Sequence, residues 1–443
     1  MNKKRKSHIS RRDFLRLAGL TSAGAILSAC QPTATESAVP TEVSPATPMP
    51  EPGTKELNML IHSSQQVEIF QTLGDRFEAD TGISLNMIEV PFADLKTRLM
   101  SELLAETGTY DLAVIPAAML FAATPFLEDT TSLYTDELLN IIPEGALEMA
   151  KGTDNVFRGM PFDLIGPANF YRTDIYEEKG LEPPRDWDEW LNVCKQTTIE
   201  ADGDQPKVWG TLIEASAKAV QPAFKLISWF YQNGGALYDA AQKPTINLDA
   251  NVEALQFISD MVNVHEVAPR EAPEMTYEEV HNMFIQGRGS SAINWSYMTG
   301  MADGEDSKVK GNFDVAPWPG NVKEAVLIDS WSVVIPKDSK KIEAGMEFLP
   351  YVTTEEGQWD ILRIESAFLI PSYFDPNDPK VLEVSPYLGA WIEQAPYSVA
   401  QPKWEQLDSI NQSISVGMNA ALTGAMTAKE ALDQVQEEVE ALV

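Results

Sequence analysis

Residues 56–90 read ELNMLIHSSQQVEIFQTLGDRFEADTGISLNMIEV and contain the pattern that decides the fold. Two apolar runs, residues 56–62 and 83–90, have the length of strands, and residues 67–80 between them repeat apolar side chains with helical spacing. A second helix is predicted over residues 92–106 and a third strand over 110–115. Strands that alternate with helices predict an α/β fold with a parallel sheet and right-handed crossovers.

The loops after two of these strands carry candidate ligand groups. His62, Ser64 and Gln65 come at the end of the first strand, and Ala117 and Ala118 follow the third. The carboxyl ends of parallel strands line the ligand crevice in open α/β sheets. We therefore expect these positions to face a cleft.

A second informative stretch, residues 284–298, reads FIQGRGSSAINWSYM. It indicates a helix end, a glycine turn and a short buried strand that ends in Trp295 and Tyr297. Aromatic side chains at a strand end are candidate ligand platforms, and ordinary core packing is the alternative. The G-x-G-x-x-A spacing from Gly287 to Ala292 is not a dinucleotide fingerprint, because these glycines follow a helix and open a strand.

The first 29 residues have the features of an export signal. Arg11 and Arg12 precede Phe14 and Leu15, as in twin-arginine signals. The apolar run over residues 17–29 is too short for a membrane span, which needs about 20 residues. The sequence LSAC ending at Cys30 resembles the lipobox of bacterial lipoproteins, in which the cysteine is acylated and holds the protein at the outer face of a membrane.

Residues 30–55 are rich in Pro, Thr, Ser, Ala and Glu and predict a disordered tether. The folded part then begins at residue 56. Its length of roughly 390 residues exceeds one hydrophobic core, so two lobes are expected. Cys194 is the one cysteine beyond Cys30, which leaves no internal disulfide.

The chain is strongly acidic, with a formal net charge of −33. Removal of residues 1–29 takes away seven basic residues and one acidic residue, and 26 basic against 65 acidic residues remain. The mature charge is therefore −39. This balance argues against nucleic acid and against a polyanionic ligand, because both require a basic surface.

The C-terminal part, from residue 339, is predicted to be mainly helical. Thr276 with Glu279 and Thr427 with Glu430 have the spacing of capping boxes, which predicts helix starts at these threonines. Residues 329–335, DSWSVVI, predict another strand with an acid and a tryptophan at its beginning.

Several runs together resemble one family, the extracellular solute-binding proteins of ABC importers, in the branch of maltose-binding and other sugar-binding receptors. No single run is diagnostic, but their order and spacing are specific and cover nearly all of residues 56–443. The runs are NFYRTDIYEEKGL (169–181), Pro184 with WDE (187–189), NGG (233–235), MFIQGR (283–288) through NW (294–295), residues 332–341, EFL (347–349) and LIPS (369–372).

The resemblance implies the type II periplasmic-binding-protein fold, in which two lobes are joined by hinge-crossing strands. Lobe 1 is expected over residues 56–163 and 296–330, and lobe 2 over residues 164–293 and 331–443. The crossings would fall near residues 161–164, 293–295 and 330–332. The resemblance also implies a lipid-anchored monomer at the extracytoplasmic face that passes its solute to a membrane permease.

By the pattern of the family, the ligand groups come from both lobes and the hinge. A polar loop after the third strand is common in sugar receptors, whereas this chain has PAAM at residues 116–119. The loop therefore does not identify the solute. The expected ligand residues are His62, Ser64, Gln65, Asp163, Gln221, Phe224, Trp295, Tyr297, Asp329, Trp331, Tyr397 and Trp404.

Aromatic platforms beside Asp and Gln acceptors suit a sugar, because it has C–H groups on its faces and hydroxyls in its plane. A ligand that bridges both lobes would favour the closed state. Acids and tryptophans also form cation cages, so a polyamine or a quaternary ammonium solute is the alternative. A surface-anchored glycoside hydrolase could use Asp163 and Asp329 as paired carboxylates, but few histidines and no hydrolase or metal motif accompany them. We therefore expect no catalytic residues, no metal and no cofactor.

Overall fold

The computed structural model describes residues 55–241, 243–365 and 367–443. The predicted signal peptide, the lipidation site at Cys30 and the tether up to residue 54 lie outside these ranges. The described residues form a five-stranded sheet, a three-stranded sheet and a two-stranded pair with their helices, and this arrangement confirms the predicted two-lobe α/β fold.

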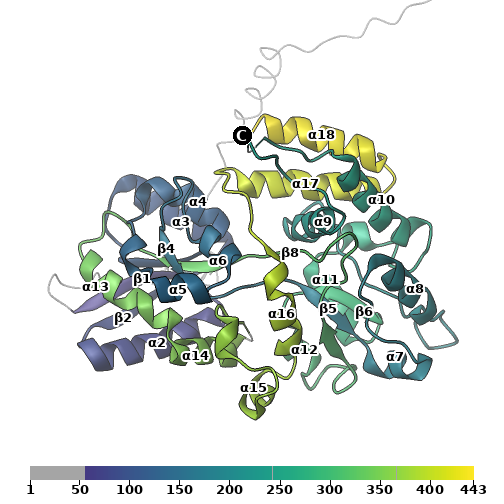
Figure 1. Ribbon diagram of the computed structural model, residues 1–443, viewed down its shortest axis with the longest axis horizontal. Helices are drawn as coiled ribbons and strands as arrows, with labels where there is room; N and C mark the ends of the chain where they lie inside the picture. The colour runs from purple at the N-terminus through teal and green to yellow at the C-terminus, as the bar shows by residue number, and fades with distance from the viewer. Residues whose placement is uncertain (1–54, 242, 366) are drawn as a thin grey trace, which may run out of the picture. The chain divides into compact units, whose positions relative to one another are not determined.

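The first sheet has the strand order β2-β1-β3-β9-β4. β1 pairs in parallel with both β2 and β3, as the alternating pattern predicts, whereas β9 runs antiparallel to β3 and β4. The crossover helices α2 and α3 connect the parallel strands (Figure 1). The bounds are β1 Glu56–His62, α2 Gln66–Thr81, β2 Ser84–Val90, α3 Phe92–Ala105, β3 Leu112–Pro116, β4 Gly159–Pro161 and β9 Trp331–Val334.

The apolar side chains that set the helical spacing of α2 are the ones that it buries. Phe70 and Phe77 have no exposed surface, and Phe70 packs edge-on against Phe162 with 5.2 Å between ring centroids. Phe77 packs in the same way against Phe348, at 5.3 Å. Burial of such aromatic rings is a large part of the stability of a core. The first lobe is therefore built around the helix that the opening sequence predicts.

The second sheet has the order β6-β5-β7, and all its pairs are antiparallel. A short parallel pair is formed by β8, which follows β7 along the chain, and β10. Helices α7 to α12 and α16 to α18 belong to this part of the molecule (Figure 1). The bounds are β5 Ala168–Tyr171, α7 Thr173–Lys179, α8 Trp187–Thr197, α9 Gln221–Gln232, α10 Asp249–Asn263, α11 Tyr277–Ile285, β6 Ser291–Asn294, α12 Met298–Ala302, β7 Asp314–Ala316, β8 Val326–Leu327, α16 Leu388–Gln394, β10 Ser398–Val399, α17 Leu407–Leu422 and α18 Ala428–Glu440.

The remaining elements are short helices. The α-helices are α4 Ala117–Ala123, α5 Asp136–Ile141, α6 Glu144–Met149, α13 Ile342–Phe348, α14 Glu355–Glu365 and α15 Pro379–Val384. The 3-10 helices are η1 Thr124–Phe126, η2 Thr131–Leu133, η3 Ala272–Glu274, η4 Leu349–Thr353, η5 Pro371–Tyr373 and η6 Ala395–Tyr397. α11 and α18 begin with complete capping boxes at Thr276 and Thr427, as predicted.

The structure corrects the predicted division of the chain between the lobes. β7, in the segment 296–330 expected in lobe 1, pairs with β5 of the second sheet. β9, at the start of the segment expected in lobe 2, pairs with β3 and β4 of the first sheet, and α14 packs on α2. The predicted crossing near residues 293–295 is therefore wrong. The reason is that β6 and β7 occupy the two edges of β5, so the chain stays in one sheet between them.

Candidate functional site

A cavity of about 290 Å³ lies where the strand ends of the two sheets meet the first turns of several helices. Its volume is near the lower end of the range for small-molecule pockets, about 300–1,000 Å³. Six aromatic side chains and six polar ones line it together with small apolar groups. The lining residues are Phe92, Pro116, Ala118, Ile165, Val220, Gln221, Phe224, Tyr277, Trp295, Ser296, Tyr297, Asp329, Trp331, Ala367, Gln401, Asp408 and Asn411.

One wall of this cleft is an aromatic stack on the first sheet. His62, the last residue of β1, stacks on Trp331 with 4.8 Å between ring centroids and an interplanar angle of 29°. The ring centroid of Phe92, the first residue of α3, lies 5.9 Å from that of Trp331. Burial lowers the pKa of His62, although its hydrogen bond with Gln66 opposes this shift. His62 is therefore neutral near pH 7 and supports the ring of Trp331 as a stacking partner.

A second wall is formed by aromatic residues that follow β6 or begin α11. Tyr277 lies edge-on to Trp295 and to Tyr297, with 6.1 Å between centroids in each case. The hydroxyl of Tyr297 lies 3.0 Å from Nδ1 of His281, which holds this ring in place. Aromatic side chains from two sheets that line one cavity can contact the faces of a flat or ring-shaped ligand.

A buried ion pair lies behind the second wall. Nζ of Lys225 is 2.9 Å from Oε1 of Glu214, and the two side chains are 2% and 0% exposed. Burial raises the pKa of Glu214 and lowers that of Lys225, while their attraction opposes both shifts. Nζ of Lys225 also lies 4.9 Å from the ring centroid of Trp295. The lysine thus holds one side of Trp295 by a cation–π contact.

Asp329 is the acidic group at the junction between the β8 segment and β9. Its Oδ1 accepts hydrogen bonds from the backbone N–H of Ser330 at 3.0 Å and from Nε2 of Gln401 at 3.1 Å. Burial raises the pKa of Asp329 from 3.8 to about 7, and the charge of Asp408 adds to this shift while the hydrogen bonds reduce it. The carboxyl of Asp329 therefore changes between its protonated and ionised forms near neutral pH.

Replacement of Asp329 by asparagine should remove a pH dependence from the stability of the ligand-free protein. A carboxyl whose folded-state pKa lies above its unfolded value keeps its proton up to a higher pH in the folded state than in the unfolded state. The free energy of unfolding therefore falls as the pH rises from about 4 to about 7. The free energy of unfolding of the wild type should fall, relative to Asp329→Asn, by at most about 1.4 kcal/mol per pH unit in this window. Urea unfolding of both proteins at pH 4.5, 6 and 7.5 measures this difference, and parallel profiles would contradict it.

The structure brings half of the predicted ligand residues into the cleft. Gln221, Phe224, Trp295, Tyr297, Asp329 and Trp331 line it. The role of each in ligand binding stays a prediction.

The other predicted ligand residues do not line the cavity. Asp163 is fully buried, and its Oδ1 accepts the backbone N–H of Trp331 at 2.6 Å, so its carboxylate holds the start of β9. His62 lies behind Trp331, while Ser64 and Gln65 are exposed. Trp404 is buried against Tyr238, with 5.8 Å between ring centroids, and Tyr397 is 41% exposed. Their spacing in the chain carries no information about these tertiary positions.

Sequence reasoning missed six aromatic or polar side chains that line the cleft, namely Phe92, Tyr277, Ser296, Gln401, Asp408 and Asn411. Phe92 follows the carboxyl end of β2 and Ser296 lies between two predicted residues, so the strand-end rule could have found both. The others come from the start of α11 and from the C-terminal segment, where no local pattern marks them.

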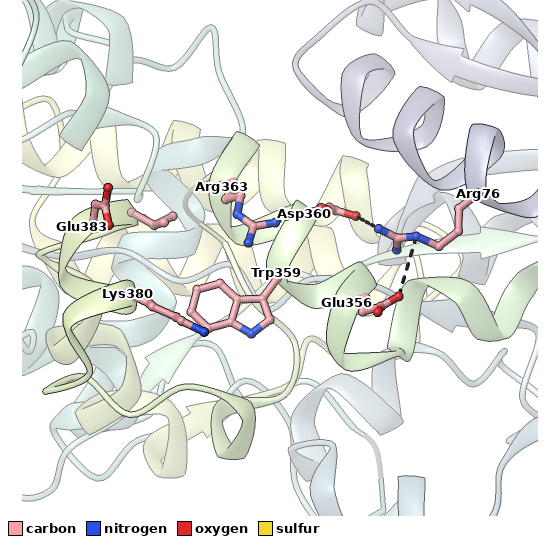
Figure 2. A pocket seen from close by; sticks show the side chains of 8 residues that line it. Arg76, Glu356, Trp359, Asp360, Arg363, Lys380 and Glu383 are labelled. Carbon is pink, nitrogen blue, oxygen red and sulfur yellow. Dashed lines mark hydrogen bonds and ion pairs between the residues drawn. The ribbon is translucent and has the colours of Figure 1, made fainter.

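A second cavity, of about 550 Å³, lies on the surface among α2, α14 and α15 (Figure 2). Its charges are largely paired with one another: Arg76 bonds Asp360 at 2.6 Å, and Arg363 lies 3.2 Å from the same carboxylate. The guanidinium of Arg363 also lies over the ring of Trp359. Such self-paired surface groups offer little to a ligand. We therefore take the aromatic cleft as the candidate site.

Residues 63–359 match the family model of bacterial extracellular solute-binding proteins, which is more than half of the chain. The chain belongs to this family. Within the described ranges of this solute-binding protein, no helix is both long enough and apolar enough to cross a membrane.

Individual relatives of the solute-binding protein are distant but cover most of it. An arabinooligosaccharide-binding protein of Bacillus subtilis is 24% identical over 315 residues, 68% of this chain and 70% of the relative. A probable amino-acid ABC transporter periplasmic-binding protein of Sinorhizobium fredii is 21% identical over 403 residues, 88% and 89% of the two chains. The maltose-bound protein MalE3 of T. maritima superposes with a TM-score of 0.75 at 20% identity, over 88% of this chain and all of that one, which shows the shared fold.

Proposed function

We propose that this solute-binding protein holds a sugar or short oligosaccharide between the two aromatic walls and delivers it to the permease of an ABC transporter. The observation that carries the proposal is a single cavity lined by two aromatic groups, Trp331 with Phe92 and Trp295 with Tyr277, and by the acceptor Asp329. Aromatic faces suit the C–H faces of a sugar ring, and the carboxyl can accept its hydroxyl protons. The B. subtilis relative is an arabinooligosaccharide-binding protein and the T. maritima protein holds maltose, which supports the same ligand class for this chain.

The proposed mechanism is closure of the two lobes around the solute. Since the walls come from different sheets, a ligand that touches both binds the closed state more tightly and shifts the population toward it. A shift from mostly open to mostly closed requires only a few kcal/mol, well within the roughly 8 kcal/mol of a micromolar ligand. Acylation at Cys30 and a tether over residues 30–55 would hold the receptor close to its permease.

A cationic solute is the second candidate. The charged side chains among the cavity lining are the acids Asp329 and Asp408, and tryptophan rings attract cations. A polyamine or a quaternary ammonium compound would use the same cleft and the same closure.

A thermal-shift screen of the purified protein tests the proposal. The panel comprises mono- and oligosaccharides, polyols, polyamines, betaines and amino acids, each in large excess. A ligand that binds only the folded state raises the melting temperature, and we expect this rise with a sugar. If the melting temperature rises only with a polyamine, a betaine or an amino acid, the proposed ligand class is wrong. If the protein hydrolyses a glycoside and no compound changes the melting temperature, the receptor function is overturned.

A further inference from the structure

Two buried amide groups at the cleft have carbonyl oxygens without a hydrogen-bond partner. Gln401 is 3% exposed and Asn411 is 2% exposed, and both line the cavity. Within the described part of the chain, no donor reaches Oε1 of Gln401 or Oδ1 of Asn411. Most buried polar atoms in folded proteins are paired, and one left unpaired is destabilising. A ligand that donates hydrogen bonds would supply the missing partners.

The strand pairing of the chain fixes the position of Gln401. β10 pairs in parallel with β8, and the backbone N–H of Ile328 continues the ladder to the carbonyl of Val399 at 3.0 Å. This register brings Gln401 beside Asp329. The side-chain amide nitrogen of Gln401 donates to Oδ1 of Asp329 at 3.1 Å and to the carbonyl of Ile328 at 3.5 Å.

These contacts also decide which atom of the Gln401 amide is free. A rotated amide would place Oε1 against the carbonyl of Ile328 and against Oδ1 of Asp329, which already accepts the N–H of Ser330. When Asp329 is ionised, these three oxygens have no donor between them and repel each other, so the rotated form is disfavoured. The unpartnered atom of Gln401 is therefore an acceptor.

Asn411 lies one turn into α17, three residues after Asp408 and thus on the same helix face. Ser415, four residues further on, accepts the backbone N–H of Ala223 with its hydroxyl at 3.2 Å, which joins this face of α17 to the first turn of α9. Phe224, the next residue of α9, also lines the cavity. The helix contact therefore holds Asn411 beside one aromatic residue of the cleft.

We propose that Oε1 of Gln401 and Oδ1 of Asn411 are specificity-determining acceptors that select a neutral solute with hydroxyl donors. This inference rests on the proposed function and narrows its ligand class. A quaternary ammonium group has no N–H or O–H to donate, so it would leave both oxygens unpaired. The hydroxyls of a sugar or polyol can pair them while its C–H groups contact the aromatic walls.

The charges around the cleft favour a neutral solute over a polyamine as well. The carboxylate of Asp408 is paired with Nζ of Lys96 from α3 at 2.5 Å, so its charge is already compensated. Burial raises the pKa of Asp329 to about 7, so its carboxyl is partly protonated at neutral pH. A polyamine with two or more charges would enter a site with little net negative charge to compensate them.

Two variants, Asn411→Leu and Gln401→Met, test the inference. The first should weaken ligand binding without lowering the stability of the ligand-free protein. Asn411→Leu has nearly the shape of the native side chain and lacks the acceptor. We expect about 10-fold weaker binding of hydroxylated probes, namely D-mannitol, myo-inositol, D-glucose and maltose, because one hydrogen bond is lost. The melting temperature of the ligand-free variant should stay equal or rise, because an unpaired buried oxygen is removed. A side chain with a purely structural role would lower the stability instead.

Gln401→Met should also weaken binding of the hydroxylated probes about 10-fold, and the double variant about 100-fold if the two oxygens bind separate hydroxyls. Asn411→Asp keeps an acceptor oxygen and should bind more tightly than Asn411→Leu. Gln434→Met, the same substitution at an exposed position of α18, should leave affinity unchanged. Isothermal titration calorimetry of the purified proteins gives the affinities.

The outcomes separate this inference from the proposed function. If the wild type binds a hydroxylated probe and both variants bind it equally well, the inference is overturned and the proposed function stands. If the wild type binds glycine betaine or spermidine and none of the hydroxylated probes, both are overturned. Absence of binding to any probe by the wild type would overturn both as well.

Discussion

Replacing Lys225 with methionine should lower the free energy of unfolding by about 3–5 kcal/mol. The side chain is 2% exposed, and its Nζ lies 2.9 Å from Oε1 of Glu214, which is fully buried. Removal of the lysine leaves a buried carboxyl without its partner, and the cation over the ring of Trp295 is lost at the same time. Urea unfolding followed by circular dichroism measures the change.

Two controls decide whether the isolated carboxyl causes this loss. In the double variant Glu214→Leu with Lys225→Met, both charges are absent, and stability should return to near the wild-type value because apolar side chains replace a buried pair well. Lys207 makes the same two kinds of contact at the surface, 2.8 Å from Glu200 and 4.1 Å from the ring centroid of Trp209. Lys207→Met should lower the free energy of unfolding by at most about 1 kcal/mol. Equal losses in Lys225→Met and Lys207→Met would contradict the expectation.

Replacing Trp295 with alanine should weaken binding of the solute roughly 30-fold or more, which corresponds to about 2 kcal/mol. Lys225 holds one side of the indole ring and Tyr277 packs nearly perpendicular to it, so the ring forms a rigid surface toward the cleft. A platform that is ordered before binding loses little conformational entropy when the ligand arrives. Titration calorimetry with a sugar found in the thermal-shift screen measures the affinity.

Trp209 provides the matched control for this second prediction, because it also carries a lysine over its ring but does not line the cavity. Trp209→Ala should bind the solute with wild-type affinity. Trp295→Phe keeps an aromatic face and should retain more affinity than Trp295→Ala. If all three variants bound equally well, Trp295 would be a core residue, the alternative that its sequence leaves open.

The structure explains why the local elements of this protein were predictable. The strands β1 and β2 and the helices α2 and α3 begin and end within about two residues of their predicted bounds. Their apolar side chains recur with the period of the element, and the period follows from backbone geometry and from burial of one face. The aromatic residues after β6 could be found by the same local rule, because strand ends of open sheets face a crevice.

The path of the chain between the lobes was predicted only in part. The predicted crossing near residues 161–164 lies between β4 of the first sheet and β5 of the second. The chain also changes sheets near residues 330–332, but it passes there from the second sheet to the first, opposite to the prediction, and the predicted crossing near 293–295 is wrong. A strand of a few residues can pair with several sheet edges, and its periodicity is the same in each case. The choice of β5 as the partner of β7 depends on the whole second sheet.

The sequence by itself determined the α/β class, the first parallel unit and the aromatic residues at strand ends, because each follows from side chains that are close together along the chain. The tertiary structure alone decided that Asp163 holds the backbone of β9, and that Gln401, Asp408 and Asn411 lie at the cleft. These residues reach the cleft through contacts between distant segments, such as Gln401 with Asp329 and Ser415 with Ala223. Such contacts form only after the packed elements place the segments side by side, and no local spacing records them.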